Sequence, residues 1–198
     1  MPIPTAPVRW AVFVLALLVP SGCAPEPEVR GYDVPKAVAP DAPPEQPAKV
    51  RMLAAVIPTP ADPTYSWFVK LTGPIEAVTK AEADFNAFVS SLAPTGDEKA
   101  PLKWTVPAGW TADMSNPNRL VTLTGGPADA PLQVSVSGPF GGSLASNVNR
   151  WRGLDAGLPK VSDAEALKAA KEGTVGTLKV FRVDLRGPGS AKKGMMGG

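Results

Sequence analysis

The fold is decided by two neighbouring stretches, VRMLAAVI at residues 50–57 and YSWFVKL at residues 65–71. The first is a nearly continuous apolar run that ends before Pro58, which is typical of a buried strand. In the second, large apolar side chains recur at every second position from Tyr65 to Leu71, the pattern of a strand with one buried face. Because only a short proline-bearing loop separates the two, we predict that they pair as an antiparallel hairpin.

A helix is predicted directly after this hairpin, over residues 75–92. Thr72-Gly73-Pro74 supplies its start, since proline is tolerated in the first turn of a helix. Apolar side chains from Ile75 to Leu92 fall on one stripe at about 100° per residue, and charged side chains line the opposite side. Phe85 and Phe88 lie on the apolar stripe, so we interpret them as core residues and not as a ligand pocket.

The remaining elements are shorter. Alternation predicts strands at 119–124, 132–137 and 177–186 and a minor one at 104–106, while helical periodicity predicts helices at 144–152 and from the capping box Ser162–Glu165 to near Gly173. Residues 138–143 (GPFGGS) lack the spacing of a phosphate loop and are predicted to form a strand-to-helix turn. Apolar positions change face between Val180 and Phe181, so the last strand is either bulged or covered on both sides.

This order of elements predicts a single α+β domain over residues 49–186, an antiparallel sheet with helices packed on one face. On either side of it, large apolar residues are scarce. Residues 23–48 are rich in proline and are predicted to be an extended tether, and residues 187–198 (GPGSAKKGMMGG) are predicted to be a disordered tail.

The beginning of the chain has the features of an export signal. Arg9 precedes WAVFVLALLV at residues 10–19, an apolar run too short to span a bilayer, and PSGC follows it. This stretch resembles the lipobox of bacterial lipoproteins, although Pro20 stands where the lipobox usually has an aliphatic residue. The resemblance implies that residues 1–22 are a signal peptide and that a diacylated Cys23 anchors the protein to a membrane of the cell envelope. The alternative is an ordinary cleaved signal followed by a chance cysteine. Ala24 favours the outer over the inner membrane, because lipoproteins retained at the inner membrane often carry Asp there.

Composition narrows the range of functions. The chain has no histidine and one cysteine, which excludes imidazole bases, His or Cys metal sites and an internal disulfide. We therefore expect no cofactor and no metal. Lys and Arg number 20 against 18 for Asp and Glu, so without Arg9 the mature balance is 19 − 18 = +1, which does not favour nucleic acid. Asp113, Asp129, Asp155 and Asp163 lie in or beside turns, where Asp commonly serves capping.

Four stretches carry a resemblance to a known family: RMLAAVIP, WFVKLTGP, WTVPAGW and NVNRWRG followed by GLP. They are similar to segments of a family of uncharacterised bacterial envelope lipoproteins with WFFKLTGP-type, PxGW and NVNRWRGQLGLP-type motifs. Relative to that pattern the chain has one inserted residue after Gly153 and lacks the Gln. The resemblance implies localisation and architecture but no activity. A looser likeness to the PsbP-like domains of photosystems concerns the fold.

The NVNRWRG motif holds the candidate binding patch. Asn147, Asn149, Arg150 and Arg152 surround Trp151 in the sequence, and Arg and Trp together suit carboxylate, phosphate or flat ligands. The alternative is that Trp151 is core, Asn147 caps a helix and the arginines are solvated. Trp110 is likewise either part of a binding surface or a core residue.

Three functions follow. The first is a non-catalytic, lipid-tethered binding or scaffolding domain with an envelope protein or polymer as partner, which predicts an exposed Arg/Asn/Trp patch. The second is an envelope hydrolase with two facing carboxylates about 5 to 9.5 Å apart. The third is a structural spacer or assembly subunit, in which the arginines are paired within the domain.

Overall fold

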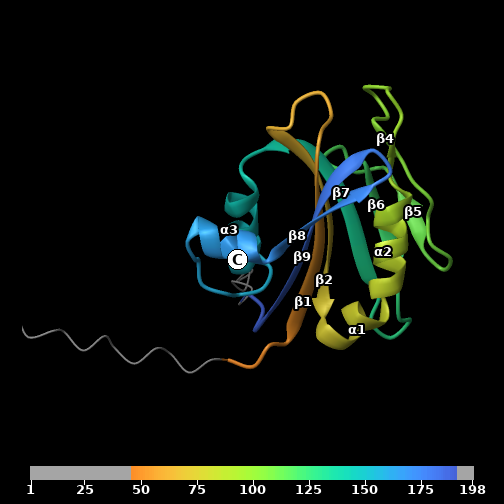
Figure 1. The fold of residues 1–198 in the computed structure, drawn as a ribbon. Coiled ribbons are helices and arrows are strands. Elements are labelled where there is room, and N and C mark those ends of the chain that lie inside the picture. Colours follow the sequence, from red (N-terminus) through yellow and green to blue (C-terminus); the bar gives the residue numbers. More distant parts are fainter. Residues whose placement is uncertain (1–45, 191–198) are drawn as a thin grey trace, which may run out of the picture. The chain divides into compact units, whose positions relative to one another are not determined.

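The computed structural model describes residues 46–190, which form one α+β domain built on a seven-stranded antiparallel sheet (Figure 1). This confirms the predicted fold class. The strands lie in the order β5-β6-β7-β2-β1-β9-β8, and a two-stranded β3-β4 ribbon stands apart. In chain order the elements are β1 (Val50–Pro58), β2 (Tyr65–Pro74), α1 (Ile75–Lys80), α2 (Glu82–Ser91), β3 (Ala93–Pro94), β4 (Leu102–Lys103), β5 (Thr111–Asp113), β6 (Val121–Gly125), β7 (Leu132–Gly141), α3 (Leu144–Leu154), α4 (Asp163–Lys168), β8 (Ala170–Val175) and β9 (Leu178–Gly187).

The predicted hairpin of β1 and β2 is confirmed and lies near the middle of the sheet. Every residue of β1 from Val50 to Pro58 has a partner in β2, and β9 pairs with the other edge of β1. Side chains of β1 are buried alternately in two cores, Leu53, Ala55 and Ile57 in one and Met52, Ala54 and Val56 in the other. Two buried faces explain why this strand is a continuous apolar run.

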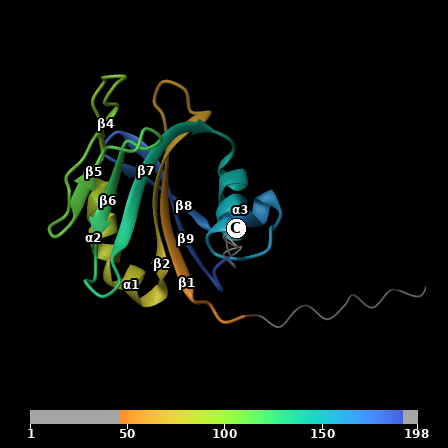
Figure 2. The same cartoon turned by 180° about the vertical axis from the view of Figure 1, so that it is seen from behind.

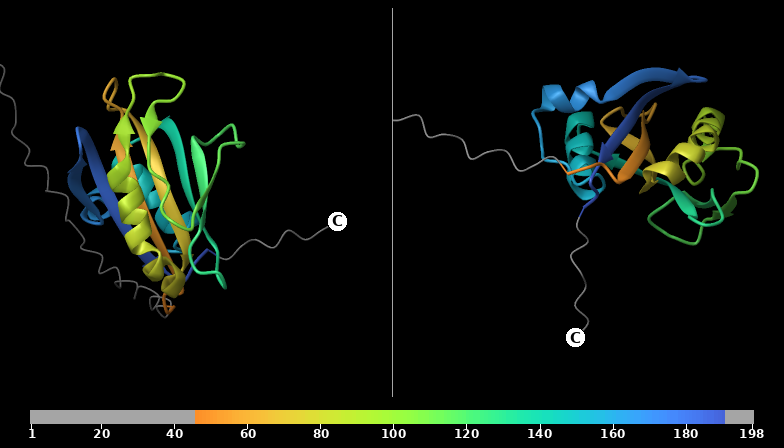
Figure 3. Two further views of the ribbon diagram at one scale, coloured as in Figure 1. Left: turned by 90° about the vertical axis from the view of Figure 1, so that its right-hand side faces the viewer. Right: turned by 90° about the horizontal axis from the view of Figure 1, so that it is seen from below.

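Helices cover both faces of the sheet, not one face as the sequence predicted. α1 and α2 pack on one side and α3 and α4 on the other, as the views from behind and from below show (Figures 2 and 3). The physical reason is that β1, β2 and β9 all carry apolar residues on both faces. In β9, Val180 faces the α1–α2 core, whereas Val183 and Leu185 face the α3–α4 core. The register of β9 is continuous with both neighbours, so it is covered on both sides and not bulged.

The predicted helix over residues 75–92 is interrupted at Ala81, where φ is −91° and ψ is 0°. Just before the break, the Thr79 hydroxyl donates to the Ile75 carbonyl at 2.7 Å, a bond that commonly bends helices. The interruption allows Thr79 and Glu82 both to reach the side chain of Arg51 on β1.

Several short elements differ from the predictions, and the strands β3 and β5 have no predicted counterpart. α4 ends at Lys168 instead of near Gly173, and residues 170–175 form the edge strand β8. This strand is mostly exposed, so its sequence has no apolar alternation to reveal it. The predicted strand at 104–106 is absent, and β4 forms just before it.

The predicted turn at 138–143 is partly strand. β7 continues to Gly141 through an irregularity between Ser66 and Phe68 of β2, and Gly138 there has a φ of +105°. An added Cβ at Gly138 would lie 2.6 Å from the Ser66 carbonyl oxygen, so this close approach of two backbones requires glycine.

The chain enters and leaves the domain at one end of the sheet. The Lys49 N–H donates to the Gly187 carbonyl at 2.8 Å, and the Gly189 N–H donates to the Ala156 carbonyl at 2.9 Å. The packed domain therefore extends past residue 186. Cys23, the predicted signal peptide and most of the predicted tether and tail lie outside the described residues. Within residues 46–190, no helix is long and apolar enough to cross a membrane.

Candidate functional site

The predicted binding patch is not an exposed patch in the folded domain. Asn147, Asn149 and Trp151 are all buried in α3, Arg152 is half-buried, and Arg150 alone is exposed. The correction has a simple cause. The five residues are consecutive or nearly so on a helix, so they point in different directions. Asn147 and Trp151, four positions apart, share one face, and Trp151 contacts Phe68 of the sheet, while Asn149 points to another side and is covered by the loop that contains Val161.

Each buried residue of the motif has a structural partner. The Asn147 side-chain amide donates to the Ser143 carbonyl at 3.0 Å, at the start of α3. Asn149 donates to the Val161 carbonyl and accepts from the Val161 N–H, both at 3.0 Å. Asn149 therefore satisfies both backbone groups of Val161, as a neighbouring strand would. This fixes the loop between α3 and α4 against the helix.

The aromatic and cationic members of the motif complete this local structure. Trp151 makes an edge-to-face contact with Phe68, with 5.7 Å between ring centroids. Phe68 in turn stacks on Phe140 at 6.5 Å. The Arg152 guanidinium donates to the Pro159 carbonyl at 3.1 Å. The NVNRWRG segment thus binds α3 to the sheet and to its following loop.

Trp110 is structural as well. It is buried in the α1–α2 core, and its indole N–H donates to the Asp84 carboxylate at 3.0 Å. Gly125 lies directly against its ring, so close that an added Cβ would be 2.5 Å from Cδ2. The turn before β5 is in this way attached to α2.

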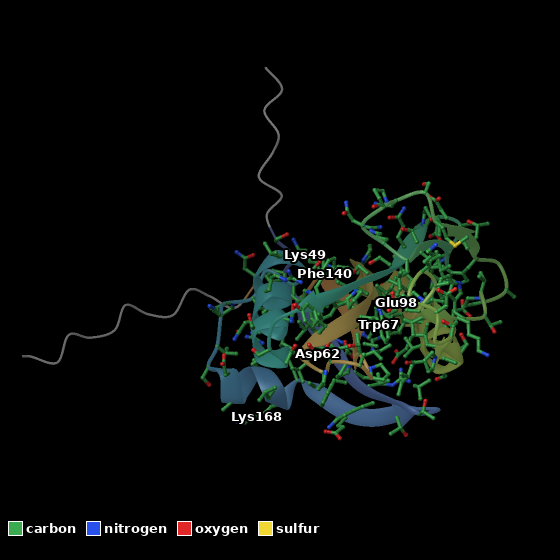
Figure 4. All side chains as sticks on the ribbon, turned by 90° about the horizontal axis from the view of Figure 1, so that it is seen from above. Lys49, Asp62, Trp67, Glu98, Phe140 and Lys168 are labelled. Atoms are coloured by element: carbon green, nitrogen blue, oxygen red, sulfur yellow. The ribbon has the colours of Figure 1, made fainter. Side chains whose placement is uncertain are left out.

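A groove of about 630 Å³ lies at the β8 edge of the sheet. We call it the edge groove. It is lined by residues of β1, α2, β8 and β9 and by the end of α4. Its polar lining is formed by Glu82 and Asn86 of α2, Lys171 of β8, and Arg182, Asp184 and Arg186 of β9. Lys168, at the end of α4, also lines the groove and is labelled in Figure 4.

A buried arginine lies beneath the edge groove. Arg51 is 3 % exposed, and its Nε and Nη2 donate to the two carboxylate oxygens of Asp184 at 3.0 and 2.7 Å. Its Nη1 donates to Glu82 at 2.7 Å and to the Thr79 hydroxyl at 3.2 Å. The hydrogen bonds to Asp184 raise the pKa of Arg51 further above its already high ordinary value, so it is always charged. Both carboxylates of the groove are thus engaged by one guanidinium.

Three cations of the edge groove have no acidic partner in the described part of the chain: Lys171, Arg182 and Arg186. Lys171 lies directly opposite Arg182 in the β8–β9 ladder, and like charges in that position destabilise a sheet. Arg182 donates only to neutral groups, the side-chain amide oxygen of Asn86 at 3.0 Å and the Ser90 hydroxyl at 3.5 Å. The groove therefore presents positive charge that an anion can neutralise.

Sequence reasoning missed this site because β8 was predicted as helix. Lys171 and Arg182 are eleven positions apart, and only the hairpin register brings them together. The one available signal was the run of charged and small residues around Gly176, which also suits a turn between two strands.

Of the four aspartates considered for catalysis, Asp113 and Asp155 make local structural contacts. Asp155 accepts from Lys70 at 2.9 Å, which links α3 to β2. Asp163 lies in the first turn of α4, whose cap is the Ser162 hydroxyl accepting from the Glu165 N–H at 3.3 Å. Asp113 accepts from the Ser115 N–H, which lowers the pKa of Asp113. Across residues 46–190, no three acidic, His or Cys side chains gather as a metal site would require.

Comparison with known proteins returns no match to a family model, to a curated protein or to a solved structure. The resemblances described for the lipoprotein family and for the PsbP-like fold remain predictions.

Proposed function

We propose that this chain is a lipid-anchored, non-catalytic binding module of the bacterial cell envelope, and that it binds an anionic group of an envelope component in the edge groove. The anchor is the predicted diacylglycerol on Cys23. The observation that supports the binding function is the Lys171–Arg182 pair, two cations placed opposite each other at an open cavity without an acidic partner among the described residues. Such a pair reduces the stability of the free domain, and a bound anion offsets this cost.

The arrangement of the acidic residues supports binding over hydrolysis. Asp184 uses both carboxylate oxygens for Arg51, and Glu82 uses one. A carboxylate-based hydrolase needs two free carboxylates that face each other, and both carboxylates of this groove are bonded to Arg51. The third function, a spacer or assembly subunit, draws support from the internal contacts of Asn147, Asn149 and Trp151. It predicts that the edge groove has no preference for an anion beyond that of the net charge.

The anchor is tested by intact mass and membrane partitioning in a bacterial host, with Cys23→Ser as the comparison. We expect the wild-type chain to carry a diacylglycerol-sized mass increment and to sediment with membranes, while the variant does neither. If both proteins are recovered without lipid and cleaved elsewhere, the domain is a freely secreted protein and the anchor is wrong.

The groove is tested by the salt concentration at which the Cys23→Ser chain elutes from a phosphate-bearing cation-exchange matrix. Two double variants remove the same charge, Lys171→Gln with Arg182→Gln in the groove and Lys80→Gln with Lys103→Gln at exposed sites outside it. We expect the groove variant to elute at clearly lower salt than the control. Equal elution would mean that net charge alone explains retention, in favour of the spacer function.

A further inference from the structure

A second pocket, separate from the edge groove, lies where α3 begins. It has a volume of about 370 Å³ and is lined by Val56, Ser66, Gly142, Ser143, Leu144 and Phe181, with the loop between β1 and β2 over it. We call it the α3 pocket. Its lining residues come from the loop that joins β1 to β2, drawn in orange in Figure 1, from the segment where the chain turns from β7 into α3, and from β9.

The α3 pocket contains hydrogen-bond donors from a helix start. α3 has 11 residues, and the first N–H groups of a helix have no partner within it. Ser143 is the N-cap, and its hydroxyl accepts from the Ser146 N–H at 3.1 Å, which leaves the N–H groups of Leu144 and Ala145 at the pocket end of the helix. The first turn has no acidic residue, so the positive end of the helix dipole is not neutralised by the helix itself.

A buried hydroxyl points into the same pocket. Ser66 is 7 % exposed, and its Oγ has no hydrogen-bond partner in the part of the chain that the structure describes. It shares a face of β2 with Phe68, the face that packs against α3, so its side chain is directed toward the pocket. The Ser66 hydroxyl is not sealed from solvent, so it is available to donate to a group bound in the pocket.

The walls and charges of the pocket define the ligand class. Val56, Leu144, Phe181 and the prolines of the loop are apolar, and no cationic side chain lines the pocket. Lys179 lies 5.0 Å over the Phe181 ring but is already paired with Glu172 at 2.9 Å. In the loop over the pocket, the Thr64 hydroxyl and N–H hold the pKa of Asp62 below its usual range, so Asp62 is ionised (Figure 4). Repulsion from Asp62 grows with the negative charge of the ligand, so a singly charged group is disfavoured less than a doubly charged one.

We infer that the α3 pocket binds a carboxylate carried on a small apolar group, with the carboxylate at the N–H groups of Leu144 and Ala145 and the Ser66 hydroxyl donating to it. The N–H groups at the start of a helix bind a single negative charge well. A volume of 370 Å³ fits a small molecule or the last side chain and C-terminal carboxylate of a peptide. This site is independent of the edge groove, so the failure of one proposal does not affect the other.

The test is an amide NMR titration of the ¹⁵N-labelled full chain carrying Cys23→Ser. The probes are phenylacetate and isovalerate, each compared with its uncharged amide, and an N-acetylated dipeptide ending in valine, compared with its C-terminal amide. We expect saturable shifts of the Leu144 and Ala145 resonances with the acids and at least about tenfold weaker binding of the amides. Preference for the dipeptide over the free acids would identify a peptide C-terminus as the source of the carboxylate.

Two variants complete the test. Ser66→Ala removes the buried hydroxyl and is expected to weaken carboxylate binding several-fold, while Ser135→Ala, the same change on β7 outside the pocket, leaves binding unchanged. An otherwise unchanged spectrum shows that each variant is folded. The proposal is overturned if no acid produces a saturable shift, if acids and amides bind equally, or if both serine variants bind like the parent chain.

Discussion

At the scale of single residues, Arg51 has the most demanding environment. A guanidinium that is 3 % exposed needs a partner for each of its donors, and Asp184 supplies a two-point contact where Glu82 supplies one. The side chains of Asp184 and Glu82 are similarly exposed, 43 % and 40 %, so the two carboxylates differ in the number of bonds they make to Arg51 more than in solvation. This makes them a matched pair for measuring what the two-point contact contributes.

We predict that Asp184→Asn lowers the free energy of unfolding by about 2 kcal/mol, while Glu82→Gln lowers it by about 1 kcal/mol. The first change replaces one of the two acceptor oxygens that face Arg51 with an NH₂ donor and removes a negative charge, and the second leaves the two-point contact intact. Urea denaturation followed by circular dichroism measures both values. An equal loss, or a larger one for Glu82→Gln, would contradict the ranking.

Two glycines give opposite predictions for the same substitution. Gly125→Ala places a methyl group 2.5 Å from the Trp110 ring and is expected to destabilise the domain by about 1–3 kcal/mol. Gly153→Ala, near the end of α3, meets no atom within 4 Å and is expected to stabilise it by about 0.5–1 kcal/mol through helix propensity. Thermal unfolding should shift in opposite directions, and a shift in the same direction would refute the packing assigned to Gly125.

The candidate site shows what the sequence could and could not predict for single residues. An Asn or Arg on a helix is compatible with either a surface or an internal hydrogen bond, and only the position of the opposing loop decides between them. Asn149 became structural because Val161 lies beside it in the fold. The alternative interpretation of the motif named burial of Trp151, which the structure shows. It also named capping by Asn147, which is wrong: the cap of α3 is Ser143, and the Asn147 amide donates to the Ser143 carbonyl.

At the scale of elements, the loop between α3 and α4 depends on one side chain. We predict that Asn149→Ala costs about 2–3 kcal/mol, because the N–H and C=O of Val161 both lose their partner. The neighbouring exposed change Arg150→Ala should cost less than about 0.5 kcal/mol. Hydrogen exchange of the Val161 amide should accelerate in the first variant alone, and acceleration in neither would show that the loop is held by other contacts.

Elements with a buried face could be predicted, and those without one could not. The β1–β2 and β6–β7 hairpins follow from apolar patterns that burial requires. β8 is an edge strand with Val175 as its single buried residue, so its pairing is determined by β9 and not by its own sequence. The edge groove depends on that pairing, which is why it could not be found from the sequence.

At the scale of the whole molecule, two hydrophobic cores share one sheet. β1 contributes alternate residues to each core, so neither core can lose its packing without disturbing the strand common to both. We predict a single cooperative unfolding transition. Val89→Ala in α2 and Val148→Ala in α3, both fully buried and from opposite cores, should each shift that one transition by about 2 kcal/mol.

The measurement is denaturant unfolding recorded in parallel by circular dichroism and by tryptophan fluorescence. Coincident curves for both variants support a shared transition. A variant whose two curves separate would show that one face of the sheet unfolds on its own.

The hydrogen bond between Lys49 and Gly187 places the points where the chain enters and leaves the domain side by side. Because these two points are adjacent, the domain can be inserted into a surface loop of another protein with only a few linking residues. The two ends of the interrupted loop would need to separate by no more than the distance between two paired strands. By the same geometry, joining the two ends and cutting the chain between β1 and β2 yields a circular permutant with the sheet order preserved.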